Sequence, residues 1–188
     1  TPLESAILLA AGYGLRRGEI SALCFSDIDL DACTIHISKA YAKSNDNSWL
    51  LKSPKSYAGT RTISVSANLI DRLYANRTDP QRVLPFPPDY ITNHFSRLCD
   101  RLGMSFRFHD LRHYNASIML AMNIPDKYAM ERLGQSTPGM IKSVYQHIMA
   151  DKRQEVSSLV NSAADDLLVQ CDTKCDTKSE APLKINVL

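Results

Sequence analysis

The sequence predicts a mostly α-helical domain with a small antiparallel β-sheet, an α+β fold. Residues 33–65 contain runs in which apolar and polar side chains alternate, as they do in strands. The segments before and after this region instead have helical spacing. The 188 residues, 44% of them hydrophobic, are enough for one buried core. We therefore expect one folded domain over residues 1–170 and a disordered polar tail over 171–188.

Two helices are expected at the N-terminal end. The apolar run at 3–11 ends at Gly12 and Gly14, and glycine is typical of helix C-termini. The segment RGEISAL, residues 17–23, predicts a second, short helix. Acidic residues then alternate over 27–31, as they do in a calcium loop, but the required Gly and distal Glu are missing. We interpret this segment as a solvated turn that leaves the second helix.

The small sheet is expected between residues 33 and 65. Alternation over 34–38 and again over 60–65 predicts two strands. Between them, SNDN at 44–47 is typical of a turn, and 49–51 predicts a short third strand. We expect these segments to form one antiparallel sheet of about three strands.

From Ser66 onward the pattern is helical. We expect helices that begin at Pro87–Pro88 and end at Gly103, that run from His109 to Met122, and that run from Pro125 to a stop at Gly134. Pro138 is expected to begin a further helix. A last amphipathic helix follows from apolar side chains at i, i+3, i+4 and i+7 spacing: Val156, Leu159, Val160, Ala163 and Leu167.

The composition narrows the class of protein. The net charge is only +2, but residues 1–150 hold 17 basic and 13 acidic residues, which favours a polyanionic partner. No run of about 18 apolar residues exists, so we expect no membrane-spanning helix. The N-terminal residues lack the features of a signal peptide. Because the chain has no initiator Met and enters an apolar helix at once, we interpret it as part of a longer protein.

The five cysteines favour a reducing compartment, because an odd number without a secretory signal is not typical of a disulfide framework. We interpret Cys24, Cys33 and Cys99 as buried thiols, because their neighbours are apolar. Cys171 and Cys175 belong to a short duplication with no His or further Cys at zinc spacing. No metal or cofactor is therefore expected.

Four separate segments carry groups suited to a phosphodiester. Each segment alone has an ordinary structural explanation, and only their joint order and spacing indicate a shared function. In the first segment Arg16 and Glu19 lie one helical turn apart, so the carboxylate can orient the guanidinium. The others are PKSYAGTRTISV from residue 54, with Lys55 in a β-turn and Lys52 as its rival; HDLRH, with His109 and Arg112 on one helix face; and LGQSTPGMIKSVYQH, with Tyr145 ten residues after Gln135.

This order resembles the catalytic domain of the tyrosine recombinases, the phage integrase family. That family shows a G-L-R-x-x-E-L-like helix, a Lys in a hairpin of the form PKT…R-x-I-P, then H-x-L-R-H, and L-G-H followed ten residues later by Tyr. The chain has GLRRGEI, PKSYAGTRTIS, HDLRH and LGQ…Y, and the resemblance covers residues 5–148. Gln135 departs from the family's usual His or Trp. It keeps a hydrogen-bond donor but cannot carry a proton as imidazole does.

The resemblance implies the catalytic fold of DNA breaking and rejoining enzymes and a role for each matched residue. Tyr145 would attack a DNA phosphate, and Lys55 would protonate the leaving oxygen. The other implied residues would bind or polarise the phosphate, or orient a residue that does so: Arg16, His109, Arg112, Gln135 and, behind Arg16, Glu19.

The implied partners are double-stranded DNA and further copies of the chain, in a tetramer joined through the C-terminal helix. The implied location is the cytoplasm of a prokaryotic host, on DNA. The N-terminal DNA-binding regions of the family would lie outside this chain. Two alternatives stay open: a type IB topoisomerase-like enzyme that relaxes DNA, and a catalytically weak DNA-binding module, which Gln135 favours.

Overall fold

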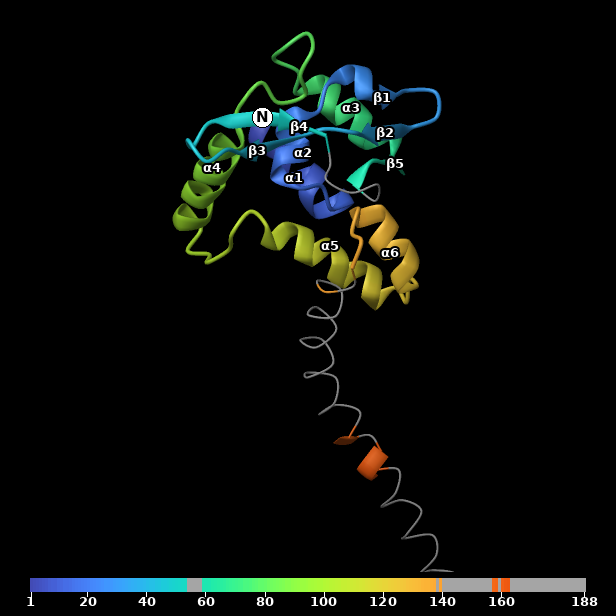
Figure 1. The fold of residues 1–188 in the computed structure, drawn as a ribbon. Coiled ribbons are helices and arrows are strands. Elements are labelled where there is room, and N and C mark those ends of the chain that lie inside the picture. The colour runs from blue at the N-terminus through green and yellow to red at the C-terminus, as the bar shows by residue number, and fades with distance from the viewer. Residues whose placement is uncertain (54–58, 138, 140–156, 159, 163–188) are drawn as a thin grey trace, which may run out of the picture. The chain divides into compact units, whose positions relative to one another are not determined.

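The computed structural model of the chain describes residues 1–53, 59–137, 139, 157–158 and 160–162 (Figure 1). The chain divides into two compact units, Thr1–Tyr145 and Gln146–Leu188. In the second unit the described residues are helical and exposed. Most of the helix predicted from Pro138, most of the predicted helix at 156–167 and the whole predicted tail at 171–188 lie outside the described residues.

The first helix, α1 (Pro2–Tyr13), has clear signals at both ends. Thr1 and Glu4 form a capping box at its start, and Gly14, at φ 71°, closes it in the left-handed conformation that glycine adopts at little cost. The second helix, α2 (Arg17–Ala22), begins three residues later. Both predicted helices are confirmed.

Strands form two sheets rather than the single sheet predicted. Within the described residues, β1 (Ile28–Asp29), β2 (Thr34–Ile37) and β5 (Arg61–Ser64) form an antiparallel sheet in the order β1-β2-β5. A separate hairpin pairs β3 (Ala40–Lys43) with β4 (Trp49–Lys52). The predicted strand at 49–51 therefore exists, but its partner is β3, which the sequence did not predict.

The β3–β4 hairpin packs on α2 instead of joining the first sheet. A Cβ atom added to Gly18 would lie 2.4 Å from the carbonyl oxygen of Tyr41, so only glycine allows the two backbones to approach this closely. The hairpin thereby lies beside the start of α2, where Arg16 and Arg17 are found.

The predicted solvated turn is present in part: residues 30–33 form a turn, and Asp29 and Asp31 are exposed, whereas the start of the segment is not a turn. There the chain forms a 3-10 helix, η1 (Phe25–Asp27), followed by β1. The Asp27 side chain is only 13% exposed, because its carboxylate accepts hydrogen bonds from Cys24 N at 2.8 Å and from Lys39 Nζ at 3.0 Å. These two partners account for its burial.

Among the described residues of the first unit, four further helices follow: α3 (Ala67–Ala75), α4 (Pro88–Arg101), α5 (Asp110–Ala121) and α6 (Asp126–Leu133). Helix α5 packs along α1, and α6 packs against α5 and β5 (Figure 1). Gly134, at φ 62°, ends α6 as predicted. No helix among the described residues is long and apolar enough to span a membrane.

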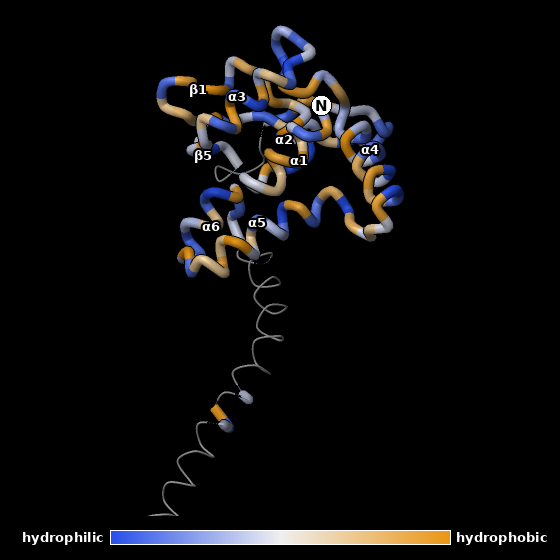
Figure 2. Tube along the Cα trace, turned by 180° about the vertical axis from the view of Figure 1, so that it is seen from behind, coloured by the Kyte–Doolittle hydropathy of each residue, from blue (hydrophilic) through white to orange (hydrophobic). Residues whose placement is uncertain are grey.

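One hydrophobic core joins helices α1–α4, η1 and the first sheet. Its apolar stretches, orange in Figure 2, come from helices and from the first sheet, with Leu9, Ile20, Ile35 and Ile91 all at 0% exposure. Of the predicted buried thiols, Cys99 is buried, whereas Cys24 and Cys33 are only half-buried. Both lie where a strand or short helix meets a loop, so solvent reaches them from one side.

Candidate active site

Arg16 immediately precedes α2 and is its N-cap residue. Its backbone N–H donates to Glu19 Oε2 at 2.8 Å, and its guanidinium Nη1 donates to Glu19 Oε1 at 2.7 Å. The predicted pairing of Arg16 with Glu19 is therefore present. It is a capping interaction at the N-terminus of α2, and not an ion pair between two residues inside the helix. The Arg16 side chain stays 38% exposed, whereas the Glu19 side chain is 4% exposed.

Arg112 reaches the same place from α5. It is 1% exposed, and its guanidinium donates to the backbone carbonyl of Gly14 and to that of Leu133, the latter at 2.6 Å. Burial lowers the pKa of Arg112 to about 9, and the nearby positive charges of Arg16 and Arg61 act in the same direction while Glu19 opposes them. The side chain is still protonated at neutral pH, so it contributes a full positive charge.

A third arginine, Arg61 of β5, completes this cluster. Its Nη1 and Nη2 atoms donate to the two carboxylate oxygens of Glu19, each at 3.0 Å, in a bidentate pair. Arg61 is not among the site residues predicted from the sequence. The sequence did contain a signal for it. Arg61 and Ile63 are two residues apart in a strand and so share its core-facing side, where an arginine is unusual. We call Arg16, Arg61, Arg112 and Glu19 the arginine cluster.

The C-terminal end of α6 holds the arginine cluster together. Its last carbonyls lack partners within the helix and carry the negative end of the helix dipole. Three consecutive carbonyl oxygens each accept a hydrogen bond from a different arginine: Arg132 O from Arg61 Nε at 2.8 Å, Leu133 O from Arg112 Nη2 at 2.6 Å, and Gly134 O from Arg16 Nη2 at 2.8 Å. Segments that are far apart in the sequence therefore meet at one turn of backbone.

The arginine cluster carries a net positive charge. Its three guanidiniums are balanced by the single carboxylate of Glu19, which leaves two positive charges. Burial alone would raise the pKa of Glu19, but Arg61 and Arg16 outweigh that effect and lower it. The carboxylate is therefore ionised at neutral pH. A partly exposed arginine beside two buried ones is suited to bind an anion.

His109 is the N-cap residue of α5 and lies close to the arginine cluster, with part of its side chain surface exposed to solvent. Burial lowers its pKa, and the nearby charges of His113 and Arg112 lower it further. The His109 imidazole is therefore neutral at pH 7, a form in which one ring nitrogen accepts and the other donates.

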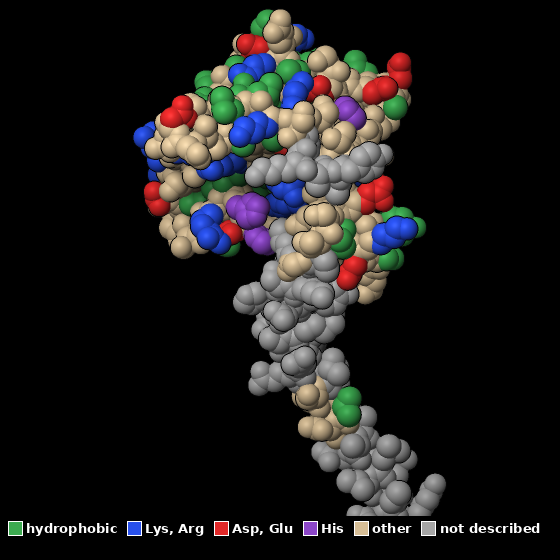
Figure 3. Space-filling view, in the orientation of Figure 1, with side chains coloured by type: hydrophobic (Ala, Val, Ile, Leu, Met, Phe, Trp, Pro, Cys, Tyr) green, Lys and Arg blue, Asp and Glu red, His purple; other side chains and the backbone are tan. Residues whose placement is uncertain are grey.

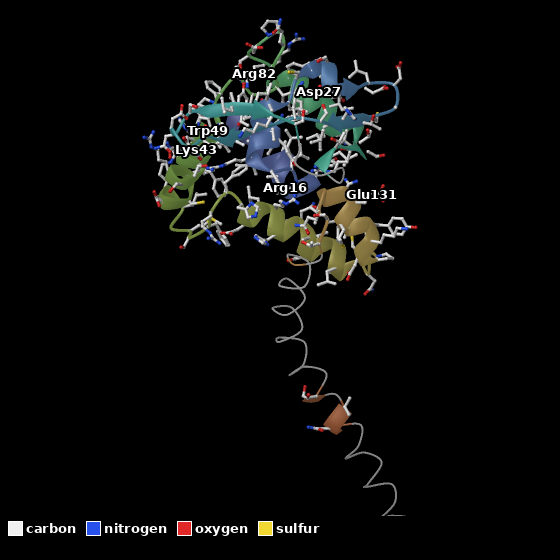
Figure 4. All side chains as sticks on the ribbon, in the orientation of Figure 1. Arg16, Asp27, Lys43, Trp49, Arg82 and Glu131 are labelled. Carbon is white, nitrogen blue, oxygen red and sulfur yellow. The ribbon has the colours of Figure 1, made fainter. Side chains whose placement is uncertain are left out.

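An open cavity of about 440 Å³ lies against Arg16 and His109. Its other polar wall residues come from α2, the β3–β4 hairpin, α4 and the loop before α5: Arg17, Glu19, Tyr41, Thr92 and Arg107. Figure 3 shows histidine side chains next to basic ones at a hollow on one face, and Figure 4 shows Arg16 at the centre of the unit, close to α5. The cavity is thus lined on several sides by cationic side chains.

Gln135 follows Gly134 directly, and its backbone N–H donates to the Met130 carbonyl at 2.9 Å. The turn that receives the three arginines therefore also fixes the backbone of Gln135. Lys55 and Tyr145 lie outside the described residues. Lys52, the rival of Lys55, is exposed at the end of β4. Among the described residues no group of His, Cys, Asp and Glu side chains could hold a metal ion.

The family model described as Phage integrase family matches residues 1–152 of this chain. The chain belongs to the phage integrase family. Its predicted fold class is also confirmed, since the integrase of transposon Tn1549 superimposes with a TM-score of 0.66 at 20% identity, over 83% of this chain and 58% of that one. For a lambda integrase fragment the TM-score is 0.51 at 21% identity, over 76% of this chain and 51% of that one.

Relatives of this integrase-family chain carry matching names. A Mycobacterium tuberculosis protein named as an integrase of prophage phiRv2 is 28% identical over 179 residues, which cover 87% of this chain and 47% of that protein. A protein of Caldanaerobacter subterraneus named tyrosine recombinase XerC-like is 22% identical over 191 residues, covering 85% of this chain and 49% of that protein. The chain thus spans about half the length of the curated relatives that it matches.

Proposed function

We propose that this chain is the catalytic domain of a site-specific DNA recombinase of the integrase type. The domain cuts and rejoins DNA strands through a 3′-phosphotyrosyl intermediate on Tyr145. The observation that carries the proposal is the arginine cluster. Two of the arginines predicted from separate motifs, Arg16 and Arg112, donate to adjacent carbonyls of one turn beside an open cavity. A scissile phosphate bound there would meet two uncompensated positive charges.

The reaction follows from general phosphoryl-transfer chemistry. The Tyr145 oxygen attacks the phosphorus, a new P–O bond forms to the tyrosine, and the bond from phosphorus to the 5′-oxygen breaks. Lys55 gives its proton to that leaving oxygen, and attack by a 5′-hydroxyl reverses the steps. Because the phosphodiester energy is kept in the tyrosyl link, rejoining needs no nucleotide cofactor. The proposed steps also use no metal ion.

The arginines act by stabilising the transition state, in which negative charge accumulates on the non-bridging oxygens. Guanidiniums that are already held in place need not reorganise when that charge develops. By analogy with oxyanion holes, each such donor contributes on the order of 10²–10³ in rate. Gln135 would donate one further hydrogen bond to the phosphate.

His109 supplies the remaining chemistry. A phenol with a pKa near 10 must lose its proton to attack at neutral pH. The lowered pKa of His109 keeps its imidazole neutral at pH 7, so it can accept that proton or donate a hydrogen bond to the phosphate. Arg16 and His109 line the same cavity, which supports action on one substrate.

Double-stranded DNA is the proposed partner, in the cytoplasm of a prokaryotic cell. The neighbouring Tn1549 and lambda integrase structures contain bound DNA, which supports this choice. On DNA we propose a homotetramer joined through the C-terminal helix around residues 156–167, whose sequence carries an apolar stripe. The catalytic domain is proposed to extend to residue 170.

A covalent adduct tests the function. The protein is incubated with a nicked duplex carrying the end sequence of its own mobile element, because the nick traps the tyrosyl link by releasing the short strand. Denaturing electrophoresis should show a protein–DNA adduct. Tyr145→Phe removes only the attacking oxygen, so the adduct should disappear while DNA affinity stays within a few-fold.

Two outcomes would contradict the proposal: an adduct formed by Tyr145→Phe at the wild-type rate, or no adduct with the wild-type protein. Transfer of the cleaved strand to a second duplex separates a recombinase from a relaxing enzyme. An adduct that religates only to its own duplex would favour the topoisomerase-like alternative.

A further inference from the structure

Arg61 is the member of the arginine cluster for which the proposed reaction has no role. It is 8% exposed, deeper than Arg16, and it lies at the start of β5. Six residues before it in the sequence stands Lys55. A buried cation of this kind is costly unless it is paired and hydrogen-bonded, so its partners reveal what it does.

The Arg61 guanidinium uses each of its nitrogens within the protein. Nε donates to Arg132 O at 2.8 Å, Nη1 donates to Glu19 Oε1 at 3.0 Å and to Gly59 O at 3.3 Å, and Nη2 donates to Glu19 Oε2 at 3.0 Å. A guanidinium has five N–H groups, and these bonds use four of them. Little donor capacity is left for a phosphate, so Arg61 is not suited to touch the substrate itself.

Arg61 instead controls two neighbours that are suited to do so. The first is Arg16, because Glu19 Oε1 accepts from both guanidiniums, from Arg16 at 2.7 Å and from Arg61 at 3.0 Å. The bidentate pair with Arg61 fixes the plane of the carboxylate, and this plane decides where the Arg16 guanidinium lies.

The second neighbour is the end of α6. The bond from Arg61 Nε to Arg132 O holds the turn whose Gly134 carbonyl accepts from Arg16. Gln135 follows that turn, so its position is set by the same contact. One buried side chain thus connects the strand after the Lys55 segment to both Arg16 and Gln135.

We propose that Arg61 is a positioning residue of the recombination reaction, acting through Glu19 and through the end of α6. The inference rests on the proposed function. Without Arg61, Glu19 would have Arg16 as its remaining cationic partner and could draw both Arg16 nitrogens to itself. Arg16 would then leave Gly134 O and turn away from the cavity. DNA would still bind, but cleavage would slow.

Single-turnover cleavage of the nicked substrate at saturating DNA tests this proposal. It is measured well below the melting temperature of each variant, so that every protein is folded. We expect Arg61→Met to cleave about 10²-fold more slowly than wild type, the effect of misplacing one preorganised donor. The DNA dissociation constant should change by less than threefold. Arg61→Lys should recover little of the rate, because an ammonium cannot span both Glu19 oxygens and Arg132 O.

The matched control is Arg82→Met. Arg82 is half-buried, less deeply than Arg61, but like Arg61 it donates to a backbone carbonyl, Ser21 O at 2.7 Å; its guanidinium carbon lies 5.2 Å from the centre of the Tyr41 ring. None of its described contacts includes Glu19 or α6. If the loss of any such arginine slows cleavage through stability alone, the two Met variants should behave alike.

The cleavage rate of a double variant, Arg16→Ala with Arg61→Met, separates a positioning role of Arg61 from a simple loss of stability. Arg16→Ala removes the residue through which Arg61 acts, so adding Arg61→Met should slow cleavage by less than about fivefold more. If the rate reductions of the two single variants multiply in the double variant, Arg61 does not act through Arg16. Cleavage by Arg61→Met at the rate of the Arg82 control would overturn the inference while leaving the proposed function intact.

Two further outcomes are informative. If both Arg61 variants fail to fold, the residue is structural and the inference is wrong. If the wild-type protein forms no adduct, the proposed function fails, and the inference fails with it.

Discussion

Replacing Glu19 with glutamine tests the central contact of the arginine cluster. The carboxylate accepts four hydrogen bonds: from Arg16 N at 2.8 Å, Arg16 Nη1 at 2.7 Å, and Arg61 Nη1 and Nη2 at 3.0 Å each. Glutamine keeps one acceptor oxygen and turns an NH₂ group toward donors, so two of these bonds are lost. Charge-assisted bonds contribute about 1.5–3 kcal/mol each. Breaking a buried ion pair costs about 3–5 kcal/mol.

We therefore expect Glu19→Gln to lower the free energy of unfolding by about 3–5 kcal/mol at pH 7. Urea denaturation followed by circular dichroism measures this difference. For a chain of this size the melting temperature should fall by about 6–20 °C. Glu131→Gln is the matched control, since Glu131 is exposed on α6 and the same chemical change there should cost less than about 0.5 kcal/mol.

The difference in the free energy of unfolding between wild type and Glu19→Gln should also depend on pH. The pKa of Glu19 lies below its ordinary value of 4.5, because Arg61 and Arg16 outweigh the effect of burial. A carboxyl with a lowered pKa stabilises the fold above its unfolded pKa, and this stabilisation is lost as the pH falls through the folded value. The gap between wild type and Glu19→Gln should thus be constant from pH 7 to about 5 and shrink below 4.5.

A variant within about 1 kcal/mol of wild type at pH 7 would refute this reasoning. So would a gap that stays constant far below pH 4.5, because the loss would then come from packing and not from charge.

Further predictions concern the residues proposed to act on DNA. Arg112→Lys should slow cleavage by about 10²-fold or more in single-turnover assays, because a single ammonium nitrogen cannot take the places of the two guanidinium nitrogens that reach Gly14 O and Leu133 O; wild-type rates would contradict this. Because the pKa of His109 lies below its ordinary 6.5, the wild-type rate should fall on acidification with a midpoint below pH 6.5, whereas His109→Gln should be slower with no such fall; a midpoint above pH 7 would contradict it. Gln135→Ala should lose about 1–3 kcal/mol of transition-state stabilisation and Gln135→His should stay active, and unchanged cleavage by the Ala variant would remove this position from the site. Lys55→Ala should be restored by a 5′-bridging phosphorothiolate, whose leaving group needs no proton; failure would assign the general acid elsewhere, with Lys52 as the next residue to test.

Helix ends were the most predictable part of the fold. Gly14 and Gly134 both adopt positive φ and end helices where the sequence predicted. Strand pairing was less predictable. Strand β3 has no alternation of buried and exposed residues, and its partner is decided by packing on Gly18, a contact between segments that the local sequence does not encode.

Site residues that belong to a short motif could be predicted from the sequence. Contacts with distant residues and with backbone carbonyls could not. Arg16, Glu19 and Arg112 were selected by spacing within motifs, and they meet in the structure. Arg61 was missed because its partners lie far away: Glu19 is 42 residues distant in sequence and Arg132 is 71 residues distant. Periodicity could indicate that Arg61 faces the core, as Ile63 does, but only the tertiary structure shows that a carboxylate is its partner there.

The docking of three arginines onto backbone carbonyls has a consequence for sequence variation. A carbonyl oxygen is the same whatever side chain its residue bears, so the side chain of Arg132 can change without removing the acceptor that Arg61 uses. What cannot change freely is the path of the main chain. Gly134, at φ 62°, leads that path out of the helix, and an insertion within 132–134 would move every acceptor at once. Related proteins could therefore differ in the side chain at position 132 and still hold the same arginines, provided that the length and the turn are kept.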